Sequence, residues 1–434
     1  MMGPSTAVTV PLLALRARRI DRLRDSGGIG KHHPRAIATT RPADVAAALG
    51  GALLPGSGGR VVVIDASGPL PLPRDALGRL PDPVEPGRPL VCLDTETTGL
   101  GTSAGTLPFL IGLGVWDGDR FSVRQLLLSD HAAEPEFLAA VRDAIPPDAW
   151  LVTYNGRSFD WPLMVTRFRL HHHPPPAHAG HLDLLPLARQ LWRHRLPDAR
   201  LCSVEAGVCG VVREADLPGA LIPERYFAFL RHGRAESLLE VVRHNRQDVA
   251  SLARLLLALS RSLDPHAWPA EIHPGDLHGL GRAYVRRRRY TEALTCFEAA
   301  LATALPPSSL PTQEADPSQV PVSQRAAVDR ARTLARMGRH DEAARVWAEI
   351  ASQGDRLAAI AWIQVAKRRE HHDGDPTAAL AAAGRAAELA LRGREAGNPV
   401  PWVERDLCRR LPRLRAAAAR GVRAAAARAL PSVA

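Results

Sequence analysis

The most regular pattern of hydrophobic and polar positions lies between Pro89 and about Leu263. Three apolar runs predict successive strands at Leu90–Leu93, Phe109–Trp116 and Phe121–Leu128. After them, helical and strand-like patterns alternate: a helix at Glu134–Ile145, a strand at Trp150–Tyr154, a helix at Ser158–Leu170, a short strand at Leu182–Leu185 with a helical stretch to Arg195, and a long helix at Ser237–Ser260. This order predicts an α/β domain in which helices flank a mixed sheet.

From about residue 273 the chain becomes Ala- and Arg-rich helical sequence with an internal repeat. Small and aromatic residues take the offsets of a tetratricopeptide repeat at Leu280, Gly281, Tyr284, Ala293, Phe297 and Ala300. A second copy has Ala343 and Trp347 at equivalent positions, and a third, poorer copy includes Trp362 and Ala378. The polar insertion Pro306–Pro321 separates the first two copies. The pattern predicts an all-α, tetratricopeptide-like domain, although a tail of generic helical hairpins would look similar.

The first 86 residues are less regular. A short helix is predicted at Leu12–Arg24, and Val61–Ile64 has the character of a strand. The Pro-rich spacing from Pro69 to Pro89 is typical of a linker. We therefore predict three parts: a poorly defined N-terminal region and linker at 1–86, the α/β domain at 87–263, and the helical repeat domain with a basic tail at 264–434.

Composition narrows the class of protein. With 46% hydrophobic and 23% charged residues over 434 positions, the chain is typical of a soluble protein of more than one domain. The net charge of +11 favours polyanionic partners such as nucleic acid, although the strong Arg bias is also what a GC-rich genome would produce. Five cysteines without a C-x-x-C pair fit a reducing cytoplasm. No stretch approaches the roughly 18 apolar residues that span a bilayer, so we expect no membrane association.

Two carboxylates stand at the end of the first predicted strand, Asp94 and Glu96. Because side chains alternate along a strand, both point to one face while Thr95 points away. Two hard oxygen donors on a rigid strand are suited to Mg²⁺ or Mn²⁺. An acidic pair at a strand end is weak evidence by itself.

Two further carboxylates lie near predicted helices. Asp160 follows Asn155 in a turn before a helix, where it could bind a metal or cap free N–H groups. Asp248 lies four residues after His244, so the two side chains share one helix face. His244 could orient or deprotonate an attacking water there, or the two could form a surface ion pair. Gathering four carboxylates is costly unless cations neutralise them.

The order D-x-E, then N-x-x-x-F-D, then H-x-x-x-D resembles the DEDD superfamily of ribonuclease H-like exonucleases over about Val91–Leu257. Additional residues resemble the bacterial YprB-type ribonuclease H-like family, whose members often carry a helical-repeat tail: Asp94–Leu100, Gly105–Leu107, Ile111–Gly114, His181–Leu185 and His244–Asn245. The resemblance implies that Asp94, Glu96, Asp160 and Asp248 hold two Mg²⁺ or Mn²⁺ ions. It also implies hydrolysis of DNA or RNA phosphodiesters, 3′→5′ from a free end.

One residue departs from the superfamily pattern, which usually has Tyr four residues before the last Asp or His five before it. Here His244 stands at the Tyr spacing, as in YprB-type sequences, and its role as general base stays open. Asp183 could support the site, cap a helix or be a surface residue. His171–His173 is better explained as a loop than as a metal site. Two other functions also stay open: a non-catalytic module that binds nucleic acid, with the repeats docking a protein, and a structure-specific endonuclease.

Overall fold

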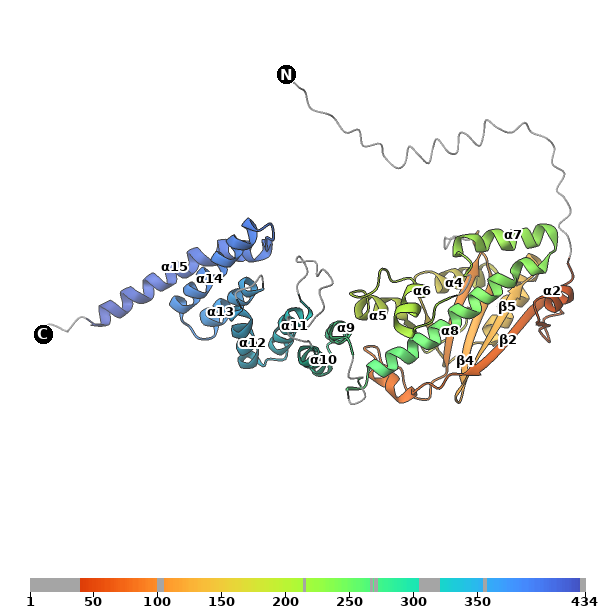
Figure 1. Ribbon diagram of the computed structural model, residues 1–434, viewed down its shortest axis with the longest axis horizontal. Helices are drawn as coiled ribbons and strands as arrows, with labels where there is room; N and C mark the ends of the chain where they lie inside the picture. Colours follow the sequence, from red (N-terminus) through yellow and green to blue (C-terminus); the bar gives the residue numbers. More distant parts are fainter. Residues whose placement is uncertain are drawn as a thin grey trace, which may run out of the picture.

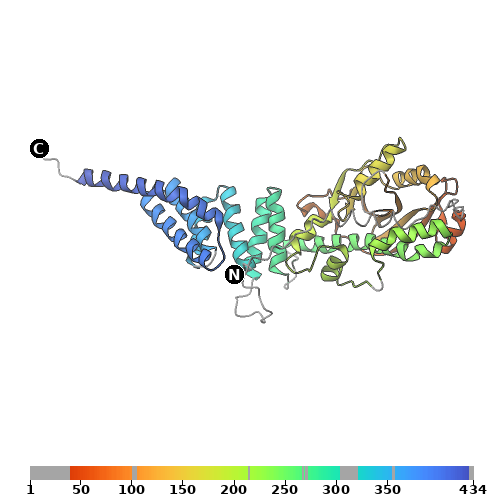
Figure 2. The same ribbon diagram turned by 90° about the horizontal axis from the view of Figure 1, so that it is seen from above.

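The computed structural model describes residues 40–99, 105–213, 216–265, 268, 272–303, 321–353 and 357–429. The predicted helix at 12–24 and nearly all of the Pro-rich insertion lie outside these ranges. A sheet with its helices forms one end of the molecule, and helices α9 to α15 continue from it in a row (Figures 1 and 2). No helix among the described residues is long and apolar enough to cross a membrane.

The sheet has seven strands in the order β1-β2-β5-β4-β3-β6-β7. Its strands are β1 (Ala52–Leu53), β2 (Val61–Pro69), β3 (Leu90–Thr97), β4 (Pro108–Asp117), β5 (Arg120–Leu128), β6 (Trp150–Thr153) and β7 (Gly180–Asp183). From β1 to β3 the neighbouring strands are antiparallel, whereas β3, β6 and β7 run parallel. The predicted mixed sheet is confirmed, with β3 at the change from antiparallel to parallel pairing.

The helices of this domain pack on the sheet. They are α2 (Pro42–Ala48), α3 (Glu134–Asp143), α4 (Asp160–Leu170), α5 (Leu184–Leu191), α6 (Leu201–Val204), α7 (Ile222–His232) and α8 (Leu239–Ser262). The long helix α8 lies across β3, β4 and β5 (Figure 1). Two glycines of β4 permit this close approach, because a Cβ atom on Gly112 would lie 2.4 Å from Asn245 Oδ1 and one on Gly114 would lie 2.7 Å from Val249 Cγ1.

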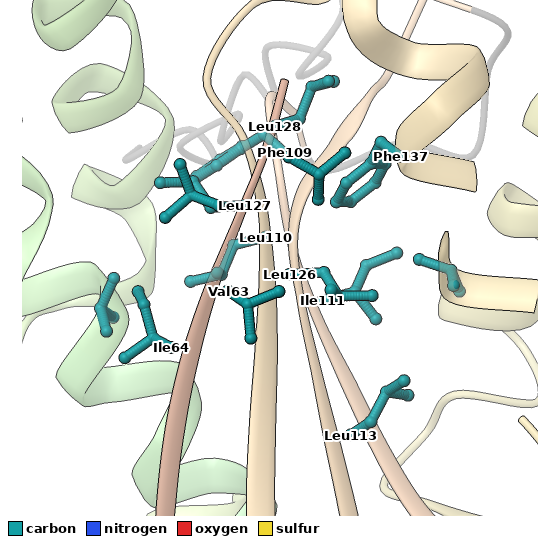
Figure 3. Packing of buried hydrophobic residues seen from close by; sticks show 14 of the residues in the cluster. Val63, Ile64, Phe109, Leu110, Ile111, Leu113, Leu126, Leu127, Leu128 and Phe137 are labelled. Atoms are coloured by element: carbon teal, nitrogen blue, oxygen red, sulfur yellow. The ribbon is translucent and has the colours of Figure 1, made fainter. Parts of the chain in front are cut away.

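Alternate residues of β3 enter two different cores. Val91 and Leu93 belong to the cluster that contains Phe137 of α3, which Figure 3 shows beside the apolar side chains of β2, β4 and β5. Leu90 and Cys92 belong to the cluster that includes residues 249–259 of α8. The same alternation directs Asp94 and Glu96 toward α8.

The boundary predicted at residue 86 is wrong for the sheet. Strand β2 pairs with β5 along its whole length, from Val61 opposite Leu128 to Pro69 opposite Arg120. The segment predicted as a linker contains a short 3₁₀ helix (Arg74–Arg79) and buries Leu77, Leu80 and Val84 against α8 and the first repeat. The Pro-rich segment is therefore an irregular connection that packs against α8 and the first repeat, and not a free linker.

The C-terminal region is all-α, as predicted. Its helices are α9 (Pro274–Arg286), α10 (Tyr290–Thr303), α11 (Val322–Arg336), α12 (His340–Ser352), α13 (Ala358–His371), α14 (Pro376–Glu395) and α15 (Pro401–Ala429). The turns between paired helices have a left-handed residue at Arg288, Gly338 and Gly374. In the region predicted as a third copy, the fully buried small residue is Ala379 and not the predicted Ala378, which is half-buried.

The first repeat is packed onto the sheet domain. Helix α9 contacts α5, and Leu280 and Tyr284 are buried in the same cluster as Trp192 and Leu256. The Tyr284 hydroxyl donates a hydrogen bond of 2.6 Å to the carbonyl of Arg79. The two regions therefore share one apolar core at their junction.

Candidate metal centre

Asp94 is held by a chain of buried amides. Asn245 Nδ2 on α8 donates to Asp94 Oδ2 at 2.8 Å. Gln125 Nε2 on β5 donates to Asn245 Oδ1 at 2.9 Å and to the carbonyl of Val242 at 2.8 Å. Gln125 and Asn245 are both fully buried, so their amides have no competing water and fix the orientation of the Asp94 carboxylate.

Asp160 is the first residue of α4 and meets the site through Thr95. The Thr95 hydroxyl, on the face of β3 opposite Asp94, donates a hydrogen bond to Asp160 Oδ1. The N-cap residue of α4 is Phe159, whose side chain makes no cap hydrogen bond, and the Asp160 carboxylate interacts with its own backbone N–H at the first position of the helix. Asn155 is a turn residue with φ of 66°, which carries the chain from β6 toward α4.

Asp183 is a structural brace next to the site. Its Oδ1 accepts hydrogen bonds from the backbone N–H of Asn155 at 2.8 Å and of Leu185 at 3.1 Å, and its Oδ2 accepts one from Arg157 at 3.2 Å. Asp183 therefore acts as a helix cap of α5 and also supports the loop before Asp160.

Asp248 and His244 lie on α8 in a network of charged groups. His244 Nε2 is 3.5 Å from Asp248 Oδ2, and His244 Nδ1 is 2.6 Å from Asp216 Oδ1. The side chains of His244 and Asp248 are mostly buried. The alternative of a surface His–Asp pair is therefore not supported, and Asp216 is a partner of His244 that the sequence analysis missed.

A second missed residue, Arg213, forms an ion pair with Asp248. Arg213 Nη2 lies 2.5 Å from Asp248 Oδ1, and Nη1 lies 3.1 Å from Asp216 Oδ2. Its Nε donates to Glu205 at 2.7 Å, and Glu205 is fully buried and also bonded to Ser251 and Arg254. A lone Arg in an irregular segment carries no periodic signal, so no sequence pattern could have identified it.

The pKa values of the carboxylates report how crowded this site is. Burial, then repulsion from the other three carboxylates, raises the pKa of Asp94 well above its usual value. Burial and repulsion from Asp248 and Asp160 do the same for the pKa of Glu96. Burial raises the pKa of Asp160 to about 6 despite the Thr95 hydrogen bond, and burial raises the pKa of Asp248 despite His244 and Arg213. The sequence-predicted carboxylates thus form one electrostatically coupled group.

The chemistry of the donor set fits divalent cations. Among the described residues, the three ligand atoms that all lie within 4.8 Å of one another belong to His194, His273 and Asp276, and no three of the four carboxylates come that close. A cation at the carboxylates would therefore have to draw their side chains together. The buried, mutually repelling oxygens are hard donors, which are the ligands that Mg²⁺ and Mn²⁺ prefer.

The His194 cluster has its own partners. His273 Nδ1 accepts the backbone N–H of Gly275 at 2.9 Å as the cap of α9. Arg195 binds Asp276 with two hydrogen bonds of 3.0 and 2.9 Å. A cation there would have to displace both interactions, so the cluster is explained as a polar contact between the sheet domain and the first repeat.

The three successive histidines form a turn after α4. His171 Nε2 lies 2.8 Å from Glu134 Oε2, and His172 has a left-handed φ of 57°. This geometry agrees with the predicted loop.

Residues 91–260 match the family model of the RNase_H superfamily. The match begins in β3 and ends in α8, so it contains all four carboxylates. Residues 91–260 are therefore similar to RNase H superfamily domains. Residues 277–311 match a tetratricopeptide repeat model, which confirms the first predicted repeat and the fold class of the helical region.

The chain is also similar to a curated protein. Over 285 residues the chain is 31% identical to the uncharacterized protein YprB of Bacillus subtilis (strain 168). The aligned part is 65% of this chain and 65% of that relative. The resemblance to YprB-type proteins with a repeat region is therefore confirmed.

Proposed function

We propose that the protein is a metal-dependent nuclease that hydrolyses phosphodiester bonds of DNA or RNA, most directly as a 3′→5′ exonuclease. The observation that carries the proposal is the gathering of Asp94, Glu96, Asp160 and Asp248 from a strand and two helices into one buried group with raised pKa values. Such a group is unfavourable without cations. The superfamily match supports the same class of reaction.

The four carboxylates would hold two divalent ions, Mg²⁺ or Mn²⁺. When bound, such ions supply Lewis acidity at the phosphate and make a water molecule more acidic. The protein's own contribution is position. Asn245 aims the Asp94 carboxylate, and Thr95 aims that of Asp160.

His244 is placed to exchange a proton beside the metal ligands. His244 Nδ1 lies 2.6 Å from Asp216 Oδ1, so we assign the proton to Nδ1, which donates a hydrogen bond to Asp216. The other ring nitrogen, Nε2, then faces Asp248. An imidazole held in this way can take the proton of an attacking water. We propose that His244 is the general base. The proposed 3′→5′ direction of hydrolysis has a different origin, the resemblance to the superfamily.

One observation favours an alternative function. The Arg213–Asp248 ion pair neutralises a carboxylate that catalysis would need, as expected of a module that binds nucleic acid without cleaving it. In that case the protein would bind nucleic acid and leave it intact with every metal.

A cleavage assay on the full chain tests the proposal. End-labelled single-stranded DNA, duplex DNA, RNA and an RNA–DNA hybrid are incubated with Mg²⁺, Mn²⁺ or EDTA. We expect metal-dependent cleavage that Asp94→Asn and Asp248→Asn abolish and that Asp65→Asn, an exposed carboxylate on β2, leaves unchanged. A substrate with a blocked 3′ end separates exonuclease from endonuclease. Cleavage that survives both site substitutions would refute the assigned site.

A further inference from the structure

We propose that the helical repeats bind the phosphodiester backbone of nucleic acid along a row of arginines on their first helices. This row, called the basic track below, is made up of Arg282, Arg286, Arg332, Arg336 and Arg368. The inference rests on the proposed function in that the bound polymer is of the same class as the substrate.

The basic track follows from the register of the repeats. Each residue of the second repeat lies 50 positions after its equivalent in the first, so Arg332 and Arg336 are the counterparts of Arg282 and Arg286. The backbone has the same register: Arg288 and Gly338 are both left-handed, with φ of 59° and 77°. The turns also share a hydrogen bond of 3.0 Å, from Arg289 to Tyr284 and from Arg339 to Leu334. The arginines are therefore repeated by the architecture and not scattered.

The groove between α9 and α11 has an excess of positive charge. Arg282, Arg286, Arg332 and Arg336 line it, and Asp329 is its one carboxylate. Asp329 lies 3.4 Å from Arg332 and 3.9 Å from Arg282. Arg286 and Arg336 are exposed, and no carboxylate among the described residues lies within ion-pair distance of either. Two guanidinium groups are thus available for an anion.

The groove beside α13 is also lined by basic side chains, like the groove between α9 and α11. Lys367, Arg368 and Arg369 line it together with Asp373. Arg369 lies 3.1 Å from Asp373, and Arg368 forms an ion pair of 2.7 Å with Asp341 just outside the groove. Arg368 is the counterpart of Arg332 in the third repeat, as judged from the left-handed turn residues Gly338 and Gly374. Two successive grooves of the repeat region therefore present the same sign of charge.

The groove between α9 and α11 offers little for a protein segment to bury. Protein interfaces depend on apolar anchors that fill pockets. Only Val285 and Phe297 are apolar in the lining of this groove, and Phe297 is fully buried, whereas the groove beside α13 also has Trp347, Val365 and several alanines. A polymer with evenly spaced phosphates suits a row of guanidinium groups, each of which binds phosphate through two N–H donors. Nucleic acid is therefore favoured over an apolar peptide.

A binding experiment in EDTA tests the basic track without cleavage. The full chain is titrated into labelled single-stranded DNA of mixed sequence at several salt concentrations. The test variant is Arg286→Gln with Arg336→Gln, and the control is Arg345→Gln with Arg392→Gln, which removes equal charge from exposed positions on α12 and α14. On single-stranded DNA each phosphate contact contributes roughly 0.7 to the slope of log affinity against log salt. We expect this slope to fall in magnitude by about 1.4 in the test variant and by less in the control.

Equal slopes in the test and control variants would overturn the proposal and leave the grooves to a protein partner. Circular dichroism checks that the variants stay folded. We expect them to fold normally because all four substituted side chains are exposed. The two proposals fail separately. A chain that cleaves normally but shows no change of slope would refute the basic track alone, and a chain that never cleaves but shows the change would refute the nuclease alone.

Discussion

Replacing Asp160 by Asn should stabilise the metal-free protein. Burial, with repulsion from Asp183 and Asp248, raises the pKa of Asp160 from 3.8 to about 6. A difference of about 2 pKa units corresponds to a cost of about 3 kcal/mol when the carboxylate is ionised. Asn has the same shape, carries no charge and can still accept the hydrogen bond from Thr95. We expect Asp160→Asn to raise the free energy of unfolding by up to about 3 kcal/mol at pH 8.

The stability gained by Asp160→Asn should increase with pH. Because the folded-state pKa of Asp160 lies above the unfolded one, the folded protein holds the proton more tightly, and its stability falls as the pH rises between the two values. The Asp160→Asn variant does not lose stability in this way. Its free energy of unfolding should equal that of the wild type below about pH 4, exceed it increasingly up to about pH 6, and exceed it by a constant amount above that pH.

Urea denaturation in EDTA over a pH series measures this difference. Asp65→Asn is the matched control, since Asp65 forms an exposed pair with Arg124 and its loss should change stability by no more than about 0.5 kcal/mol. The same Asp160→Asn protein should have lost cleavage activity. An Asp160→Asn variant that is less stable at pH 8, or a gain that does not change with pH, would refute the reasoning and make Asp160 a structural residue.

Other substitutions test the groups that support the site. Asn245→Ala removes the buried donor to Asp94 and should lower the cleavage rate about 10- to 100-fold at saturating Mn²⁺, as single-turnover kinetics would show. Gly112→Ala would place a Cβ atom 2.4 Å from Asn245 Oδ1 and should lower the free energy of unfolding by about 1–3 kcal/mol in a urea titration. Arg213→Ala removes a partner of the fully buried Glu205 and should cost about 3 kcal/mol by the same measurement.

Each of these has a control in the chain. Gly68→Ala on β2 meets no atom within 4 Å and should leave stability unchanged, in contrast to Gly112→Ala. Arg200→Ala removes an exposed ion pair with Asp198 and should have little effect, in contrast to Arg213→Ala. An Asn245→Ala protein with a normal rate would show that Asp94 needs no orienting amide.

The faces on which two pairs of candidate residues lie were predictable because they depend on local spacing in the sequence. Strand alternation places Asp94 and Glu96 on the same face, and helical spacing places His244 and Asp248 on one side of α8. Both follow from spacing alone. The structure adds the three-dimensional partners of these residues.

The supporting groups were not predictable because they depend on pairs far apart in the chain. Gln125 meets Asn245 across 120 positions, and Arg213 reaches Asp248 from an irregular segment. The place of β2 in the sheet was missed for a similar reason. The run at Val61–Ile64 looked like a strand, but its partner β5 could be known only from the pairing of Val61 with Leu128.

A titration of the full chain with Mn²⁺, followed by calorimetry, tests the central claim that the four carboxylates form a divalent-metal centre. We predict two ions per chain at neutral pH, binding that weakens as the pH falls toward 6 because protons compete for Asp160, and loss of binding in Asp94→Asn and Asp248→Asn. The Asp65→Asn control should bind as the wild type does. An unchanged titration in the two site variants, or no Mn²⁺ bound to the wild type, would contradict the account.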